Sequence, residues 1–264
     1  FGLCNDNGAM EWVIATFASA LAGFIDSIVG GGGLILLPTL FAVYPQVEPA
    51  TLLGNNKSAS VWGTGFATWR YARQVSLNWR HLLPAAGLTM LGSWAGAWAV
   101  TQTSPEFLRQ LLPVVLVLLL IYTLLRKDMG REHTPHWSPR TEWALTCVIG
   151  VGIGFYDGFF GPGTGSFFVF LLVRVLGYDF LHASAAAKLL NLSSNAAALV
   201  LFTWMGHVWW HLALPLAVAN VLGSWMGTRM ALRHGAGFVR GMFIAVVCVL
   251  VVKTSYDAFL RTSF

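Results

Sequence analysis

Two lysines, Lys57 and Lys188, stand inside otherwise apolar stretches of the sequence. An ionisable side chain in such surroundings costs about 2.5–3.5 kcal/mol on membrane-insertion scales, so residues of this kind usually serve a function. Two functions suit a lysine here, namely attraction of an anion and transfer of a proton. The alternatives are that each side chain reaches the surface or pairs with a structural aspartate.

Each lysine begins a polar face on its predicted helix, because residues i, i+3 and i+7 share one side of a helix. Hydroxyl and amide groups on this face can hydrogen bond to the oxygens of a bound anion. They can instead join neighbouring helices, which is the structural alternative. The residues with the predicted binding role are Ser60 and Thr64, Asn191 and Asn195, and Asn56 beside the first lysine.

Two glycine-rich segments, Gly30–Gly33 and Gly161–Gly165, interrupt the apolar sequence. The helix after such a break presents unpaired backbone N–H groups and the positive end of its dipole, which attract anions. Glycine also lets an oxyanion approach the backbone closely. Neither segment has the spacing of a nucleotide-binding motif. The residues predicted to contact an anion are Gly31, Gly32, Gly33, Gly163, Thr164, Gly165 and Ser166.

Two carboxylates, Asp26 and Asp157, lie about one helical turn before these breaks. Either could carry a coupling proton or balance the charge of a lysine. Either could equally hold the break in place by hydrogen bonds. The sequence leaves the proton-coupling and the structural interpretation open.

These residues recur at a constant interval of 131 positions, which aligns Asp26 with Asp157 and Lys57 with Lys188. Unrelated apolar helices match in composition but not in charged residues at one shared offset. Internal repeats of this kind are common in secondary transporters. The pattern predicts a first repeat over residues 1–130, a cytoplasmic linker over 131–141 and a second repeat over 142–264.

The composition is that of an integral membrane protein. Charged residues make up 10% of the chain, against about 25% in soluble domains, and the mean hydropathy is +0.65. The expected surroundings are therefore a lipid bilayer. The net charge of +5 does not indicate nucleic acid, because the basic residues form no run. Three widely separated cysteines indicate no metal site, and we expect no cofactor.

The distribution of basic residues predicts how the two repeats are oriented. The loop Arg70–Arg80 is basic, whereas the equivalent segment of the second repeat, Gly206–His211, contains no Lys or Arg. Since basic loops remain in the cytoplasm, equivalent loops are predicted to lie on opposite sides of the membrane. The repeats would then be inverted.

Inversion requires an odd number of crossings in each repeat. We therefore predict an all-α polytopic membrane protein with two inverted repeats, each a glycine-broken first helix forming a re-entrant hairpin, followed by three transmembrane helices. The two hairpins would comprise Trp12–Val29 with Leu34–Val43 and Trp143–Phe160 with Ser166–Leu176. Trp12–Val29 is about 27 Å long as a helix and could also cross. An eight-span bundle with parallel halves remains the alternative.

The motifs resemble those of the TauE/SafE sulfite-exporter family, also called the toluene-sulfonate uptake permease superfamily. The similar segments are Gly23–Gly33 with Pro38, Asn56–Lys57, Gly154–Pro162 and Lys188–Asn191. The chain looks most like the YfcA-type branch, and the resemblance covers nearly all of it. It implies a multi-pass transporter of the bacterial inner membrane that moves sulfur-containing anions such as sulfite, sulfonates, sulfoacetate or thiosulfate.

The function expected from these features is secondary transport of a small anion by alternating access, driven by protons. A passive anion channel is the alternative, and an intramembrane enzyme is disfavoured because the sequence lacks a catalytic cluster such as His-Glu-x-x-His. One departure from the family pattern is Asn55, where many members carry threonine. The expected partners are the anion and the bilayer, with no nucleic acid. Assembly as a homo-oligomer is left open.

Overall fold

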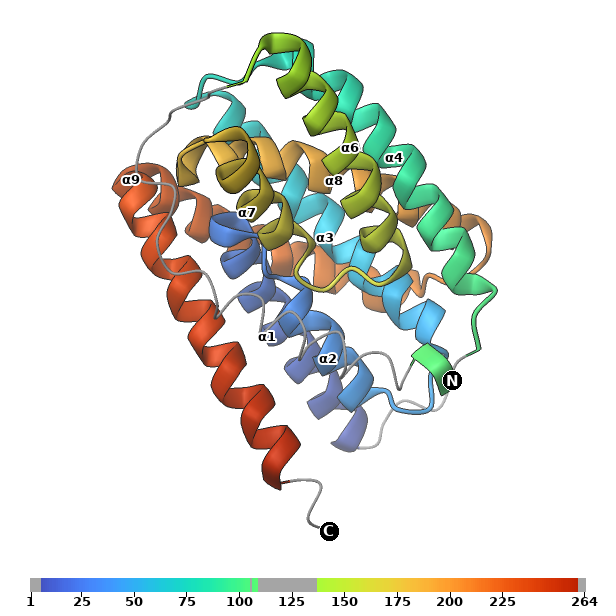
Figure 1. Ribbon diagram of the computed structural model, residues 1–264. Coiled ribbons are helices and arrows are strands. Elements are labelled where there is room, and N and C mark those ends of the chain that lie inside the picture. Colours follow the sequence, from blue (N-terminus) through green and yellow to red (C-terminus); the bar gives the residue numbers. More distant parts are fainter. Residues whose placement is uncertain (1–5, 105, 109–136, 261–264) are drawn as a thin grey trace.

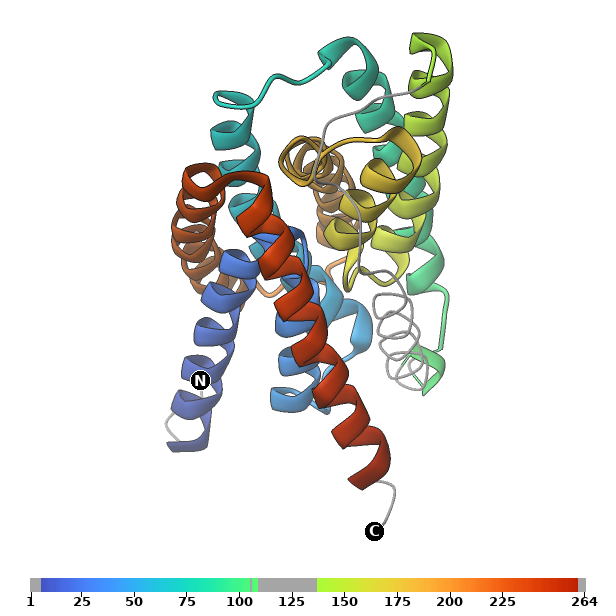
Figure 2. The ribbon, with the colours of Figure 1, turned by 60° about the vertical axis from the view of Figure 1, so that its left-hand side comes forward.

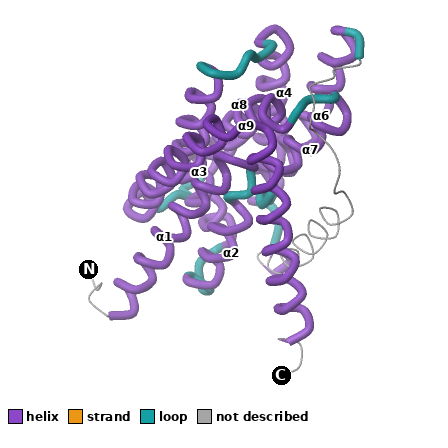
Figure 3. The backbone as a smooth tube through the Cα atoms, turned by 90° about the vertical axis from the view of Figure 1, so that its left-hand side faces the viewer, coloured by secondary structure: helices purple, strands orange, loops and turns teal. Residues whose placement is uncertain are grey.

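The computed structural model describes residues 6–104, 106–108 and 137–260 of the 264-residue chain. This part is helical and contains no strand, as the tube in Figure 3 makes clear. The prediction of an all-α protein is therefore confirmed for the described residues. The helices are α1 (Asp6–Val29), α2 (Gly33–Val43), α3 (Pro49–Ala72), α4 (Trp79–Thr101), α6 (Pro139–Phe159), α7 (Thr164–Leu176), α8 (Phe180–Trp204) and α9 (Trp210–Leu260).

The surface of the molecule is apolar while polar groups are buried inside it. Phe17, Leu91 and Val148 are each about 70% exposed, yet Lys57 and Lys188 are at most 1% exposed. Water would disfavour such a surface, whereas hydrocarbon tolerates it. Within the described residues, Met10–Val29 and Phe180–Trp204 are long and apolar enough to cross a membrane by composition.

The first helix of each half breaks at its glycines and turns back as a shorter helix. The residues at the two breaks, Gly30 and Gly161, are equivalent in the repeat and have φ angles of +82° and +94°. Residues other than glycine rarely adopt φ angles in this left-handed region. In Figure 1 α1 and α2 extend from the break toward one end of the molecule, whereas α6 and α7 extend toward the other.

The two breaks touch each other in the middle of the molecule. The backbone N–H of Ser166 donates to the carbonyl oxygen of Gly30 at 3.0 Å, and its hydroxyl donates to the carbonyl oxygen of Val29 at 3.0 Å. A Cβ on either Gly30 or Gly165 would overlap the backbone of the other. The contact therefore depends on glycine in both halves.

Pairs of small residues bring the outer helices close to the broken ones. On α4, Cβ atoms at Gly92 and Gly96 would overlap the backbone of α6, and on α9, Cβ atoms at Gly223 and Gly227 would overlap the backbone of α1. Both pairs have the spacing at which small residues join membrane helices. The helices α4 and α6, and likewise α1 and α9, form the most extensive contacts.

The last helix, α9, bends sharply at Gly235, where φ is 72° and ψ is −165°. Its two arms meet at this bend in Figure 2. Residues 109–130 of the predicted first repeat and most of the predicted linker over 131–141 lie outside the described residues. The boundaries of the two repeats therefore stay predictions.

Candidate functional site

The two buried lysines are held on the long helices α3 and α8, which run through the centre of the molecule (Figure 1). Lys57 Nζ lies 2.7 Å from Asp157 Oδ1, and Lys188 Nζ lies 3.2 Å from Asp26 Oδ2. Lys188 also donates to the backbone carbonyl of Asp26. Each lysine thus pairs with the aspartate of the opposite half. That aspartate lies near the end of α1 or α6, just before the glycine break.

The pairing of each lysine with an aspartate of the other half has an energetic consequence. Removing one member of a buried ion pair leaves an uncompensated charge and typically costs about 3–5 kcal/mol. The two pairs therefore tie the halves together at the glycine breaks. Among the alternatives that the sequence left open, pairing of lysine with aspartate is the arrangement in the structure.

A polar cavity lies between the two breaks. In this conformation its free volume is about 10 Å³, which is room for about one water molecule. Its walls combine one lysine, two carboxylates, three side-chain amides, two hydroxyls and four glycines from six helices and the segments between them. The lining residues are Asp26, Gly30, Gly33, Asn56, Lys57, Ser60, Asp157, Gly161, Thr164, Gly165, Asn191 and Asn195.

Most residues that the sequence singles out for binding therefore lie around one cavity. Two of the lining residues, Gly30 and Gly161, were not among the predicted binding residues. The sequence could have indicated them, because glycine recurs at both positions at the repeat offset. Glycine at equivalent positions of both halves indicates a positive φ angle that other residues rarely adopt.

Several predicted binding residues do not line the cavity but support its walls. Lys188 is fully buried against Asp26, and Thr64 donates from its hydroxyl to Asp26 Oδ2 at 3.2 Å. Ser166 uses both its N–H and its hydroxyl to join the two breaks. The remaining three glycines shape the turns.

Those three glycines occupy backbone positions beside the breaks. The carbonyl of Gly31 accepts from the N–H of Leu34 at 3.1 Å. A Cβ on Gly32 would press against α1 at Ala22 and Asp26. Gly163 precedes the first residue of α7 with φ of +79°.

The two ion pairs carry no net formal charge together when both are ionised, because Lys188, behind the cavity wall, balances Asp26. Its charged groups are also almost closed off, with side chains of Lys57 and Asp157 only 1% and 2% exposed. Coulomb interactions are strong in such surroundings. A change of one proton would therefore alter the affinity for an anion considerably.

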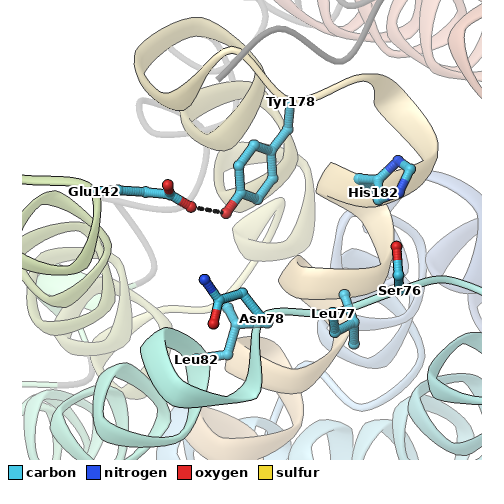
Figure 4. A pocket seen from close by; sticks show the side chains of 7 residues that line it. All are labelled: Ser76, Leu77, Asn78, Leu82, Glu142, Tyr178 and His182. Atoms are coloured by element: carbon cyan, nitrogen blue, oxygen red, sulfur yellow. Dashed lines mark hydrogen bonds between the residues drawn. The ribbon is translucent and has the colours of Figure 1, made fainter. Parts of the chain in front are cut away.

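A second, larger cavity lies at one end of the molecule, between the α3–α4 loop, the start of α6 and the α7–α8 loop. Figure 4 shows its lining residues, Ser76, Leu77, Asn78, Leu82, Glu142, Tyr178 and His182. The hydroxyl of Tyr178 donates to Glu142, and burial together with this carboxylate raises the pKa of Tyr178. Its lining residues in the described part of the chain include one histidine and no lysine or arginine.

The described residues contain no group of three or more His, Cys, Asp or Glu side chains placed to hold a metal ion. The central cavity instead offers an ammonium group, amides, hydroxyls and backbone near two helix starts. This combination suits a small anion rich in oxygen.

Comparison with known proteins identifies the family. The family model described as sulfite exporter TauE/SafE matches residues 15–254. The chain belongs to this family. The resemblance noted in the sequence motifs is thereby confirmed, and no solved structure matches the chain.

Similar curated proteins are named as transporters. The chain is 38% identical over 244 residues to the probable membrane transporter protein YfcA of Escherichia coli strain K12, covering 92% of this chain and 88% of that one. It is 36% identical to the probable membrane transporter protein ORF9 of a Sinorhizobium species, covering 91% and 90%. A probable membrane transporter protein of Haemophilus influenzae is 31% identical, covering 90% and 91%. The protein is therefore assigned to a family of membrane transporters and not to an enzyme class.

Proposed function

We propose that this TauE/SafE member is a multi-pass secondary transporter of the bacterial inner membrane that moves a small sulfur-containing anion. The observation that carries the proposal is the central cavity, where Lys57 lines a wall between two glycine breaks and is compensated by Asp157 of the other half. The printed family name, sulfite exporter, supports a sulfur oxyanion or sulfonate as the substrate.

The transport cycle that we propose uses the contact between the two halves. The breaks are joined by the bonds from Ser166 to Gly30 and Val29, and the ion pairs cross between the same halves. Rocking of one repeat against the other would part these contacts on alternate sides of the cavity. The closed surroundings of Lys57 favour such a carrier over an open channel.

The proposed coupling proton binds at Asp26. This carboxylate lines the cavity and its side chain is 13% exposed, against 2% for Asp157, so water reaches it more easily. Protonation of Asp26 would leave Lys188 uncompensated and give the cavity a net charge of +1. An anion would then be attracted, and its departure would favour release of the proton.

Inversion of the two repeats is part of the proposal. It is supported by the opposite directions of the two hairpins in Figure 1. Lys57 pairs with Asp157, and Lys188 at the equivalent position pairs with Asp26. A two-fold relation between the halves would produce this reciprocal pairing.

The proposed function is tested by ligand binding to the purified protein. Ligands that bind the folded state raise its apparent stability. We expect sulfite, thiosulfate, sulfoacetate or a sulfonate to raise the melting temperature, and matched carboxylates to do so less. Equal shifts with all ligands, or none with any sulfur anion, would contradict the proposed substrate class.

Proton coupling is tested in proteoliposomes that enclose a pH-sensitive dye. An imposed substrate gradient should move protons through the wild-type protein. Asp26→Asn should still exchange labelled substrate across the membrane but without proton movement. Proton movement in Asp26→Asn equal to that of the wild type would remove Asp26 from the coupling step.

A further inference from the structure

The two ends of the helix pair α3 and α8 are closed to different degrees. At one end, the loop after α3 (residues 74–78) lies near the start of α8. At the other end, the loop after α8 (residues 205–209) lies against the start of α3. The two loops are equivalent at the repeat offset of 131, so a strictly symmetric molecule would close both ends alike.

The loop 205–209 is closed onto α3 by side-chain and backbone contacts. The hydroxyl of Thr51 lies within hydrogen-bond distance of His207 Nδ1, at 3.3 Å. The backbone N–H of Trp209 donates to Asn55 Oδ1 at 3.2 Å. A Cβ on Gly54 would overlap the carbonyl oxygen of His207, so helix and loop touch directly. This end of the molecule is therefore shut.

The equivalent loop at the other end stands away from α8. The second cavity lies between them, with a free volume of about 260 Å³ against about 10 Å³ in the central cavity. This is room for several water molecules. Figure 4 shows Glu142 and Tyr178 on one side of the space and Leu77 and Asn78 on the other. This end of the molecule is therefore open.

Equivalent residues at the two ends differ accordingly. Ser76 is the counterpart of His207, and His182 is the counterpart of Thr51. Among the described residues no hydrogen bond joins Ser76 to His182, whereas His207 and Thr51 are joined. Thr51 is buried and His207 half-buried, whereas His182 is half-buried and Ser76 exposed.

Both ends nevertheless carry the same groups for this contact. Each has one hydroxyl and one imidazole at the two equivalent positions, with helix and loop exchanged between the ends. Each also has a carboxylate beside its imidazole at a further equivalent position. Glu48 lies 3.6 Å from His207, and Asp179 lies 2.6 Å from His182. The open end thus contains the groups that close the other one.

We propose that these residues form the two gates of the transport path, and that the structure is the state in which the Thr51–His207 gate is closed and the Ser76–His182 gate is open. This inference rests on the proposed function, because gates alternate only in a carrier. In the opposite state Ser76 would hydrogen bond to His182 while Thr51 and His207 separate. Rocking of two inverted repeats produces this reciprocal change, because each repeat takes the conformation of the other.

Closing one gate chemically and measuring the other tests the proposal without a substrate. Ser76→Cys combined with His182→Cys, in a background without native cysteines, is crosslinked with dibromoacetone in the purified full chain. Hydrogen–deuterium exchange of backbone N–H groups is then followed by mass spectrometry. We expect exchange in residues 205–209 to become at least about tenfold faster, because their contacts with α3 would be lost. Unchanged exchange would overturn the proposal, since the difference between the ends would then be fixed.

Thr51→Cys combined with His207→Cys is the matched pair. Its crosslink holds the gate that is already closed, so exchange in residues 205–209 should be no faster than in the same variant before crosslinking. Should this pair crosslink while the Ser76–His182 pair never does, the open gate does not close and the proposal falls.

Single substitutions keep the proposal testable should the paired cysteines fail to fold. Thr51→Ala removes a contact made only in the present state, so it should speed exchange in residues 205–209 and slow it in residues 74–78 at the distant gate. Ser76→Ala should produce neither change. Faster exchange in residues 205–209 of Thr51→Ala, without any response in residues 74–78, would show a local effect and contradict the coupling of the gates.

Flux separates failure of this inference from failure of the proposed function. Either crosslinked pair should carry labelled sulfite no faster than empty liposomes do, with each variant before crosslinking as its reference. Thioether crosslinks are used because sulfite cleaves disulfides. Flux that persists in both crosslinked forms would overturn the gates and leave the proposed function standing. Absence of sulfite flux in the wild type would count against the proposed function, while the exchange measurement would still decide the gates.

Discussion

At the scale of single residues, the feature that matters most is the pair of buried charges formed by Lys57 and Asp157. The desolvation of both groups is offset only while they are together. This explains how a lysine is accommodated among apolar helices, and it makes the two residues interdependent. The same reasoning applies to Lys188 and Asp26, although the Asp26 side chain is 13% exposed.

A double-mutant cycle measures this interdependence. Lys57→Met alone should lower the free energy of unfolding by about 3–5 kcal/mol, because Asp157 is left buried without a partner. Lys57→Met combined with Asp157→Leu should recover most of that loss. Unfolding in mixed micelles with increasing denaturing detergent gives the three free energies. Additive losses in the double variant would show that the pair does not act as a unit.

The sequence indicated which residues would gather at the site but not their connections. The repeat offset identified both lysines, both aspartates and both glycine breaks. It did not show that Lys57 would pair with Asp157 rather than with Asp26, because partner choice depends on how the two halves pack. The support role of Thr64 and Ser166 was hidden for the same reason, since their partners are distant in the chain.

At the scale of helices, close packing through small residues positions the cavity. The breaks occur where the glycines predict them, since a left-handed residue ends a helix wherever it stands. The pairing of α4 with α6 and of α1 with α9 was not predicted. Small residues mark that a helix packs closely, but they do not say against which partner.

Substitution of a packing glycine tests the helix contacts. Gly96→Ala should destabilise the protein, because its Cβ would overlap the carbonyl oxygen of Phe155 on α6. Gly227→Ala, at the equivalent position of α9, should have a similar effect against Phe24. Gly152→Ala is the control, since its Cβ would meet nothing within 4 Å. Melting temperatures in detergent should fall for the first two variants and hold for the third.

At the scale of the whole molecule, the proposed transport cycle needs two halves related by inversion around one cavity. In Figure 1 the two hairpins point in opposite directions from their contact, which supports that proposal. A carrier built in this way has two similar conformations, with the cavity open to one side or the other.

Cysteine labelling tests the inverted arrangement. Gln74 and Met205 are exposed and lie 131 residues apart, in equivalent loops. In a background without native cysteines, Gln74→Cys should react with a membrane-impermeant reagent only from the cytoplasmic side. Met205→Cys should react only from the opposite side. Labelling of both from the same side would favour the bundle with parallel halves.

The most direct test of the central claim is anion flux through the variant that combines Lys57→Met with Asp157→Leu. This variant keeps a neutral, well-packed centre but has lost the cation that lines the cavity. Reconstituted in liposomes beside the wild type, it should fold and show flux of labelled sulfite or sulfonate at the level of empty liposomes. Wild-type flux in a folded double variant would contradict the claim that the central cavity carries the anion.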